Sequence, residues 1–344
     1  MDFSFTEEQT ALRDVARRRL ATPVPPSWRE LHDLGWLDKD LDAVDTALLA
    51  EEAGRAHAPS EWLITQALAQ DACHAAGRPL AQPTTLAWRE PEPGPSRLDG
   101  PLDALACRAE RAPGGAVRLY GIKTRVPYAT GIEVVLVLAR GADGPGLYRL
   151  PLAALEGEPR TLSGVDTGRP WLELDLAGVP AEPLLTGAAT GALMRRIRHR
   201  ALTLLACEAV GLARAALDSA VAHARSRSQF GRPIGAYQAV SHRLVDVYSD
   251  IELAASLAYV AAWRLNDTGD EDQTATAVAA ATIAARDAAL FACEAEVQTF
   301  GAAGFLWEHP ATHRYRRARW ISCFDGTTDE HRGALGTAVL DAPW

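Results

Sequence analysis

This acidic chain contains a basic run, Met194-Arg-Arg-Ile-Arg-His-Arg200. A cluster of guanidinium groups attracts phosphate, while a solvated helix face is the other explanation for such a run. The 344-residue chain as a whole carries a formal net charge of −9. It therefore offers no general basic surface for nucleic acid or an anionic membrane, and we expect neither as a partner.

Thiols and imidazoles show no metal-binding pattern. The five cysteines are scattered without a CxxC pair, and the nine histidines lack metal-ligand spacing. We predict no metal site. Unpaired cysteines favour a reducing compartment, and the acidic residues near Met1 differ from the basic and apolar regions of a signal peptide. The Ala-rich tracts are interrupted by charges before about 20 residues, so we expect a soluble, cytoplasmic protein.

The first part of the chain, residues 1–81, predicts an N-terminal helical domain. Thr6 and Gln9 have the spacing of a capping box, in which two side chains satisfy each other's backbone donors. The three prolines of Ala21–Ser27 end that first helix. Further short helices are expected over Trp28–Trp36 and Ala43–Ala56.

Residues 82–185 have a different texture and predict a β domain inserted between helical regions. Branched residues and period-two alternation favour strands in four runs. These runs are Leu86–Trp88, Ala116–Tyr120, Glu133–Ala139 and Trp171–Leu176. Glycine and proline separate them, as expected for turns.

Residues 186–344 predict a bundle of long helices. Apolar residues recur at alternating spacings of three and four in three tracts, each of which marks one buried helix face. The faces consist of Leu205, Ala209, Leu212, Ala216 and Ala220; of Val240, Leu244, Val247, Ile251 and Ala254; and of Val278, Ala281, Ala285, Ala288 and Ala292. Long helices with short connections form antiparallel bundles.

Two motifs lie in this helical region. The first is Arg227-Ser-Gln-Phe-Gly-Arg-Pro-Ile-Gly235, followed by Gln238. The second is Val297-Gln-Thr-Phe-Gly-Ala-Ala-Gly-Phe305, continued by Trp307-Glu-His-Pro310. Taken singly, an ordinary helix connection explains the first and a small-residue helix C-cap explains the second.

Together the motifs resemble the acyl-CoA dehydrogenase family, with its R-x-Q-F-G-x-P-I signature and its Q-x-x-G-G-x-G-[YF] turn, where Ala302 replaces the second glycine. The resemblance implies a mainly α fold with an inserted β domain: an N-terminal helical domain, a middle β-barrel-like domain and a C-terminal four-helix bundle. It also implies a dimer or tetramer in which FAD lies between domains and reaches into a neighbouring subunit. Glu208 in A-x-E-x-x-G and Trp307-Glu-His are most similar to a shortened, actinobacterial branch.

The resemblance assigns cofactor contacts residue by residue. Arg227 is expected to meet the FAD pyrophosphate, because a guanidinium fork binds two phosphate oxygens at once. The cofactor is also expected to contact Gln229, Phe230 and Gln238. Gln298 and Gly301 are expected to act from across a subunit interface, and Thr327 to touch the flavin.

The catalytic loop of the family departs from its usual sequence here. Where the family has a glutamate base in a Y-E-G-T-like loop, this chain has Phe324-Asp-Gly-Thr-Thr328, so Asp325 is the matching base. The alternative is that Asp325 only begins a turn before Gly326. In the family's other arrangement the base lies on the long helix, at the position of Ala201, which has no carboxylate.

The middle domain also departs from the family. Glu92–Gly100 replaces a small-residue loop, and Arg125 and Pro127 stand where a tryptophan and a threonine normally face the flavin ring. Arg125 can stack on a π face or hydrogen-bond the ring, or it can point to solvent. Gly35–Leu41 is an abbreviated loop, which suggests a changed or wider substrate mouth.

Three functions are consistent with this sequence. The first is FAD-dependent α,β-dehydrogenation of an acyl thioester, attached to CoA or a carrier protein, with an electron-transferring flavoprotein as reoxidant. The second is a non-catalytic or flavin-sharing subunit of a hetero-oligomer, since some members of the branch share one FAD and one carboxylate between two chains. The third is a repurposed fold that performs non-oxidative thioester chemistry.

Overall fold

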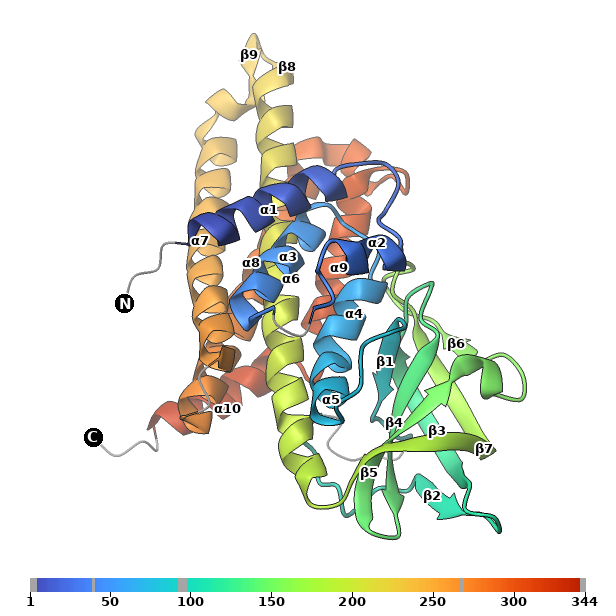
Figure 1. Ribbon diagram of the computed structural model, residues 1–344. Helices are drawn as coiled ribbons and strands as arrows, with labels where there is room; N and C mark the ends of the chain where they lie inside the picture. Colours follow the sequence, from blue (N-terminus) through green and yellow to red (C-terminus); the bar gives the residue numbers. More distant parts are fainter. Residues whose placement is uncertain (1–4, 39–40, 92–97, 267–268, 341–344) are drawn as a thin grey trace. The chain divides into compact units, whose positions relative to one another are not determined.

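The computed structural model describes residues 5–38, 41–91, 98–266 and 269–340 (Figure 1). The contacts between its residues divide the chain into two compact units. The helical unit comprises residues 1–26, 41–58 and 202–344, and the mixed unit comprises residues 27–40 and 59–201. The division into 1–81, 82–185 and 186–344 stays a sequence-based prediction.

The helical unit contains three long helices and several shorter ones. Its helices are α1 (Glu7–Leu20), α3 (Ala43–Arg55), most of α6 (Ala189–Ser226), α7 (Gln238–Asn266), α8 (Glu271–Phe300), α9 (Pro310–Ser322) and α10 (Thr328–Leu340), with a 3₁₀ turn at Gly301–Phe305. The three apolar faces predicted for α6, α7 and α8 are buried except for Val240, which is half-buried. In Figure 1, α7 and α8 lie side by side, and α10 crosses the lower part of α8.

The start of α1 follows the predicted capping box. Thr6 Oγ1 accepts from the backbone N–H of Gln9 at 3.1 Å, and the Thr6 N–H donates to Gln9 Oε1 at 3.2 Å. The predicted helix at Trp28–Trp36 is shorter in the structure, where α2 covers Trp28–Asp33 of the mixed unit. It ends early because Trp36 turns into the core of that unit, where its carbonyl accepts from Trp62 Nε1 at 3.1 Å.

Helices α3 and α6 approach each other unusually closely at two glycines. A Cβ on Gly54 would lie 2.1 Å from the carbonyl oxygen of Glu208, and one on Gly211 would lie 1.8 Å from that of Glu51. Both distances are far below van der Waals contact. The segments Glu51–Arg55 and Glu208–Gly211 are therefore the two halves of one helix crossing.

Helix α8 is the most apolar of the long helices. Among the described residues, the span Glu271–Phe305 is long and apolar enough by composition to cross a membrane, and 50% of its apolar window is buried. Arg286 and Glu296 of this helix are also buried, and Glu296 forms an ion pair with Arg314 of α9. Its neighbours are α7, α9 and α10, so its apolar character serves the bundle core.

The mixed unit contains the helices α4 (Glu61–Leu68) and α5 (Gln70–Ala75) and a closed sheet. The strands are β1 (Thr84–Ala87), β2 (Arg108–Arg111), β3 (Val117–Pro127), β4 (Val134–Gly141), β5 (Gly144–Pro151), β6 (Arg160–Leu162) and β7 (Trp171–Thr186). Their order is β1-β4-β2-β3-β7-β5, and β5 pairs back with β4. The prediction of a β-barrel-like domain is confirmed.

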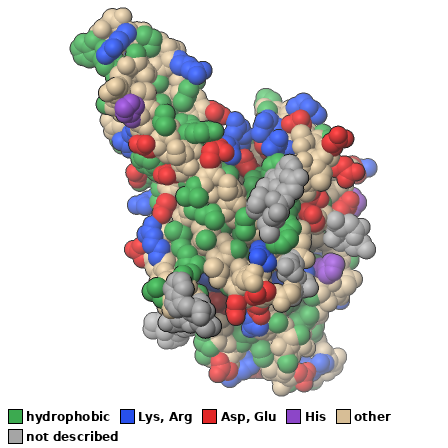
Figure 2. All heavy atoms as spheres, turned by 90° about the vertical axis from the view of Figure 1, so that its left-hand side faces the viewer, with side chains coloured by type: hydrophobic (Ala, Val, Ile, Leu, Met, Phe, Trp, Pro, Cys, Tyr) green, Lys and Arg blue, Asp and Glu red, His purple; other side chains and the backbone are tan. Residues whose placement is uncertain are grey.

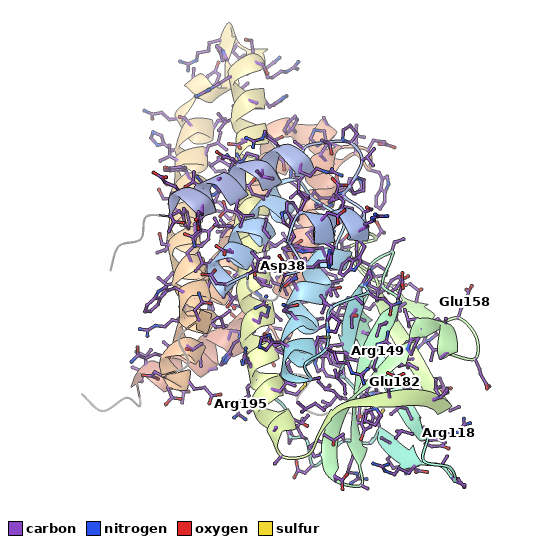
Figure 3. The ribbon with its side chains drawn as sticks, viewed as in Figure 1. Asp38, Arg118, Arg149, Glu158, Glu182 and Arg195 are labelled. Carbon is purple, nitrogen blue, oxygen red and sulfur yellow. The ribbon has the colours of Figure 1, made fainter. Side chains whose placement is uncertain are left out.

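Each of the four predicted runs overlaps a strand (β1, β3, β4 or β7), whereas β2, β5 and β6 were not predicted. β2 is mostly exposed and polar, and β5 begins with Gly144-Pro-Gly, so neither shows the alternation that marks a half-buried strand. Their pairing depends on partners distant in sequence. One example is the register of β5 with β7, which sets Arg149 opposite Glu182; Figure 3 labels both residues.

Candidate functional site

The first motif forms a tight hairpin between α6 and α7. Strand β8 (Ser228–Gln229) pairs with β9 (Arg232–Pro233) around a two-residue turn at Phe230 and Gly231. Both turn residues have positive φ, 52° and 83°, which is the type I′ geometry that matches strand twist. The side chain of Phe230 is 93% exposed. The motif thus connects α6 and α7 through a β-hairpin at one end of the bundle (Figure 1), and its role in cofactor binding stays a prediction.

Arg227 stands at the base of this hairpin. Its backbone is fixed on both sides, since its N–H donates to His223 O and its carbonyl accepts from Ile234 N, each at 2.8 Å. Its side chain is exposed, without a hydrogen bond or ion pair to another described residue. Gln229 and Gln238 are also exposed. The donors of the first motif are therefore available to a ligand.

The second motif lies at the same end of the bundle. The imidazole of His223, one turn before Arg227, stacks on the ring of Phe300 with centroids 4.1 Å apart. Phe300 also packs on His309 at 4.3 Å. The predicted partners Gln298 and Gly301 therefore come close to the Arg227 hairpin within one chain. Burial, Arg227 and His309 together lower the pKa of His223.

Gly301 is required by the backbone. It ends α8 at φ 63°, ψ −136°, a conformation that side chains with a Cβ rarely adopt, and its N–H donates to the carbonyls of Val297 and Gln298. No atom lies within 4 Å of the position its Cβ would take. The sequence-based reason, close approach of a cofactor, stays a prediction, while the open space there is compatible with it.

This end of the bundle fits a dinucleotide cofactor. The guanidinium of Arg227 and the amides of Gln229 and Gln238 are exposed on or beside the hairpin, and Gln298 is exposed near the end of α8. A guanidinium binds diphosphate oxygens in a bidentate manner, and amides can both donate to and accept from ribose and base groups. The space-filling view in Figure 2 shows Lys and Arg side chains together with hydrophobic ones at the projecting tip of the bundle.

The loop with the predicted base has an unusual backbone. Asp325 is fully buried and has φ 51°, and Gly326 follows at φ 106°. The buried guanidinium of Arg286 donates to Gly326 O at 3.0 Å and also donates to Phe324 O. Asp325 therefore has left-handed backbone geometry in a loop that Arg286 restrains, and its role as the base stays a prediction.

Thr327 begins helix α10 through a capping box. Its N–H donates to Glu330 Oε2 at 2.6 Å, and its hydroxyl accepts from the Glu330 N–H at 3.3 Å. This contact explains the threonine locally. The predicted contact of Thr327 with a flavin stays a prediction.

The two parts of the predicted site are separated along α8. Arg286, which holds the Asp325 loop, and Gln298 are twelve residues apart on that helix, about 18 Å at the α-helical rise. The described helical unit thus brings Arg227, Gln298 and Gly301 together but keeps Asp325 and Thr327 apart from them. That span suits an extended ligand or two separate binding regions.

Arg125 belongs to the mixed unit, at an irregularity of β3. The register with β7 shifts between Lys123 and Val126, and Arg125 has φ 49° there. Its side chain is exposed and makes no hydrogen bond with another described residue. The neighbouring Lys123 is fully buried and pairs with Glu90 at 2.8 Å. Lys123 on one side of the bulge is therefore a structural cation, whereas Arg125 is exposed and available to a ligand. The spacing of residues in the sequence did not reveal this difference.

The basic run Met194–Arg200 is largely engaged in ion pairs inside the mixed unit. Arg196 lies 3.5 Å from Asp71, Arg198 lies 3.5 Å from Asp99, and Arg200 donates to Gln66 O at 2.8 Å. Ala201 is fully buried. These contacts favour a structural role for the run over phosphate binding. Most of the segment Glu92–Gly100 lies outside the described residues, and no group of described His, Cys, Asp and Glu side chains could hold a metal ion.

Comparison with known proteins agrees with this geometry. The family model described as "Acyl-CoA dehydrogenase, C-terminal domain" matches residues 191–340, which include both motifs and the Asp325 loop. Residues 191–340 are therefore similar to the C-terminal domain of acyl-CoA dehydrogenases. FAD is the cofactor of this family, and the family's fold is the one described above.

Individual relatives resemble the chain over different extents. It is 35% identical over 218 residues to acyl-CoA dehydrogenase FadE34 of Mycobacterium tuberculosis, covering 62% of this chain and 26% of the relative. It is 28% identical over 236 residues to the probable acyl-CoA dehydrogenase YngJ of Bacillus subtilis, covering 63% and 58%. The chain thus spans less than two thirds of the length of either relative. A solved "Tcur3481-Tcur3483 steroid ACAD G363A variant" has a TM-score of 0.76 at 27% identity, covering 97% of this chain and 98% of that one.

Proposed function

We propose that this protein is an acyl-CoA dehydrogenase family member that catalyses FAD-dependent α,β-dehydrogenation of an acyl thioester, with Asp325 as the base. The observation that carries the proposal is the geometry of Asp325. A carboxylate side chain stands at the family's base position in a strained left-handed conformation and is held there by a buried arginine. Such strain persists only where the surroundings enforce it, and it concentrates at functional sites.

Each part of the chain has a separate task in this reaction. The Asp325 carboxylate accepts the α-proton, and its enclosure keeps water away from the proton in transit. Arg227 and the exposed amides at the end of the bundle hold the cofactor's diphosphate and polar groups. Bound FAD supplies a hydride acceptor for the β-hydrogen. Arg125, unpartnered on its bulge, is available to the ring system or to the thioester.

The experiment measures flavin reduction directly. The purified protein is mixed anaerobically with a panel of saturated acyl-CoA thioesters while flavin absorbance is followed. We expect Asp325→Asn to retain flavin and to bleach about 100- to 10,000-fold more slowly, the usual contribution of a general base. Asp329→Asn, a nearby exposed carboxylate that pairs with Arg332, is the matched control and should bleach at the wild-type rate. Wild-type bleaching by Asp325→Asn would remove the base assignment.

A second candidate is a flavin-sharing subunit of a hetero-oligomer. Its support is the exposed hairpin, whose unpartnered donors and ring call for a second surface, together with the two-component name of the solved steroid ACAD. In that case the protein expressed alone would be colourless. Flavin would be retained only on co-expression with a homologous second chain, and the Asp325→Asn comparison would then be made in the pair.

The proposal includes an alternative substrate, an acyl thioester of a carrier protein. It also includes an electron-transferring flavoprotein that reoxidises the flavin. Bleaching by acylated carrier protein but not by acyl-CoA would identify the former. Reoxidation of the bleached enzyme by such a flavoprotein, faster than by oxygen alone, would identify the latter.

A further inference from the structure

We infer that Arg286 is a positioning residue for the proposed base Asp325, an inference that rests on the proposed function. Arg286 lies on α8, is 2% exposed, and approaches the loop between α9 and α10 from inside the bundle. Its position on a different helix makes it invisible to any motif around Asp325.

The contacts have a specific form. One guanidinium nitrogen of Arg286 donates to the carbonyl of Phe324, and the other donates to the carbonyl of Gly326 at 3.0 Å. Asp325 and Gly326 lie between these two carbonyls. Two carbonyls bound by one planar fork leave the two residues between them less freedom to rotate.

The backbone between these two carbonyls requires such a restraint. Asp325 at φ 51° and Gly326 at φ 106° are two consecutive residues with positive φ. Glycine adopts this region readily, but a residue with a Cβ does so only under constraint. If the fork were absent, Asp325 would relax toward ordinary φ values and its carboxylate would move with the backbone.

The other end of the loop is held independently. Thr327 and Glu330 cap α10, and Arg332 of α10 forms ion pairs with Asp329 and with Asp287, the residue after Arg286 on α8. None of these contacts involves the guanidinium of Arg286, so an Arg286 variant does not remove them directly. The effect of an Arg286 variant is expected to concentrate on Asp325.

Lysine tests this role because it keeps the charge but cannot bind two carbonyls in the same plane. We expect Arg286→Lys to lower kcat about 10- to 100-fold, with KM for acyl-CoA and flavin content near wild type, because a shift of about 1 Å at a reacting group has that effect. The matched control is Arg317→Lys. Arg317 is also a buried arginine of the helical unit, and it pairs with the carboxylate of Glu208 on α6. Because lysine keeps the charge but not the geometry of that pair, this variant should lose thermal stability and keep its kcat per bound flavin.

A double-variant cycle separates positioning from a general structural effect. If Arg286 acts through Asp325, then Arg286→Lys has no further effect on kcat in an Asp325→Asn background. Multiplicative losses, or a kcat for Arg286→Lys equal to wild type, would overturn the inference while leaving the proposed function in place. An Asp325→Asn variant as fast as wild type would instead overturn the base assignment, and the inference would fall with it.

Discussion

The guanidinium of Arg317 on α9 lies 2.9 Å from the carboxylate of Glu208 on α6, and the two side chains are only 3% and 2% exposed. The pair joins the C-terminal part of the helical unit to the α3–α6 crossing, where the carbonyl of the same Glu208 lies against Gly54. An ion pair this deeply buried is costly to break, because the remaining charge loses both water and partner.

Breaking this pair is expected to destabilise the protein strongly. Arg317→Met should lower the free energy of unfolding by about 3–5 kcal/mol, measured by urea titration. The double replacement Arg317→Met with Glu208→Leu should recover most of that loss, because no unpaired charge remains. A single variant with wild-type stability would show that water reaches the pair.

The α3–α6 crossing predicts a steric effect at Gly211. Gly211→Ala places a methyl group where the Glu51 carbonyl now lies, so the helices must separate and the unfolding free energy should fall by about 1–3 kcal/mol. Gly333→Ala is the control, since that position on α10 has open space. It should gain about 0.5–1 kcal/mol from helix propensity. Equal effects at both glycines would contradict the close crossing.

The Phe230 turn predicts opposite effects on stability and on flavin binding. Asparagine is favoured in a type I′ turn, so Phe230→Asn should raise the unfolding free energy of the flavin-free protein by about 1 kcal/mol. The lost ring should at the same time weaken flavin retention, measured by dialysis and absorbance. Phe230→Tyr, which keeps the ring, should retain flavin as wild type does. Unchanged retention by Phe230→Asn would remove this residue from the cofactor site.

The lowered pKa of His223 predicts a pH dependence of stability. Burial is the largest cause, followed by repulsion from Arg227 and His309. As the pH falls, His223 becomes protonated in the unfolded state before it does in the folded state. Its effect on the free energy of unfolding is therefore absent above about pH 6.5, and the free energy falls as the pH decreases from there toward the lowered pKa. Arg227→Gln should raise the pKa of His223 and so narrow the pH range over which stability falls. The pKa is measured by NMR of the His223 ring protons. A titration unaffected by Arg227→Gln would place the guanidinium away from His223.

Much of the fold was predictable from short-range patterns. The three helix faces, the Thr6–Gln9 cap and four of the strands follow from residue periodicity, because a helix or a half-buried strand repeats its environment every few residues. The two motifs were sufficient to predict the family. The shorter α2 and the missed strands β2, β5 and β6 show the limit, since those elements end or pair according to distant partners.

For the candidate site, the sequence by itself determined which side chains are present: the arginine and amides of the two motifs, and an aspartate at the base position. Only the tertiary structure decided how they are held. Stacking of His223 on Phe300 joins the two motifs, a β-bulge exposes Arg125, and Arg286 from another helix holds Asp325 in left-handed geometry. These relationships depend on contacts between residues far apart in the chain, which the local spacing of residue types does not encode.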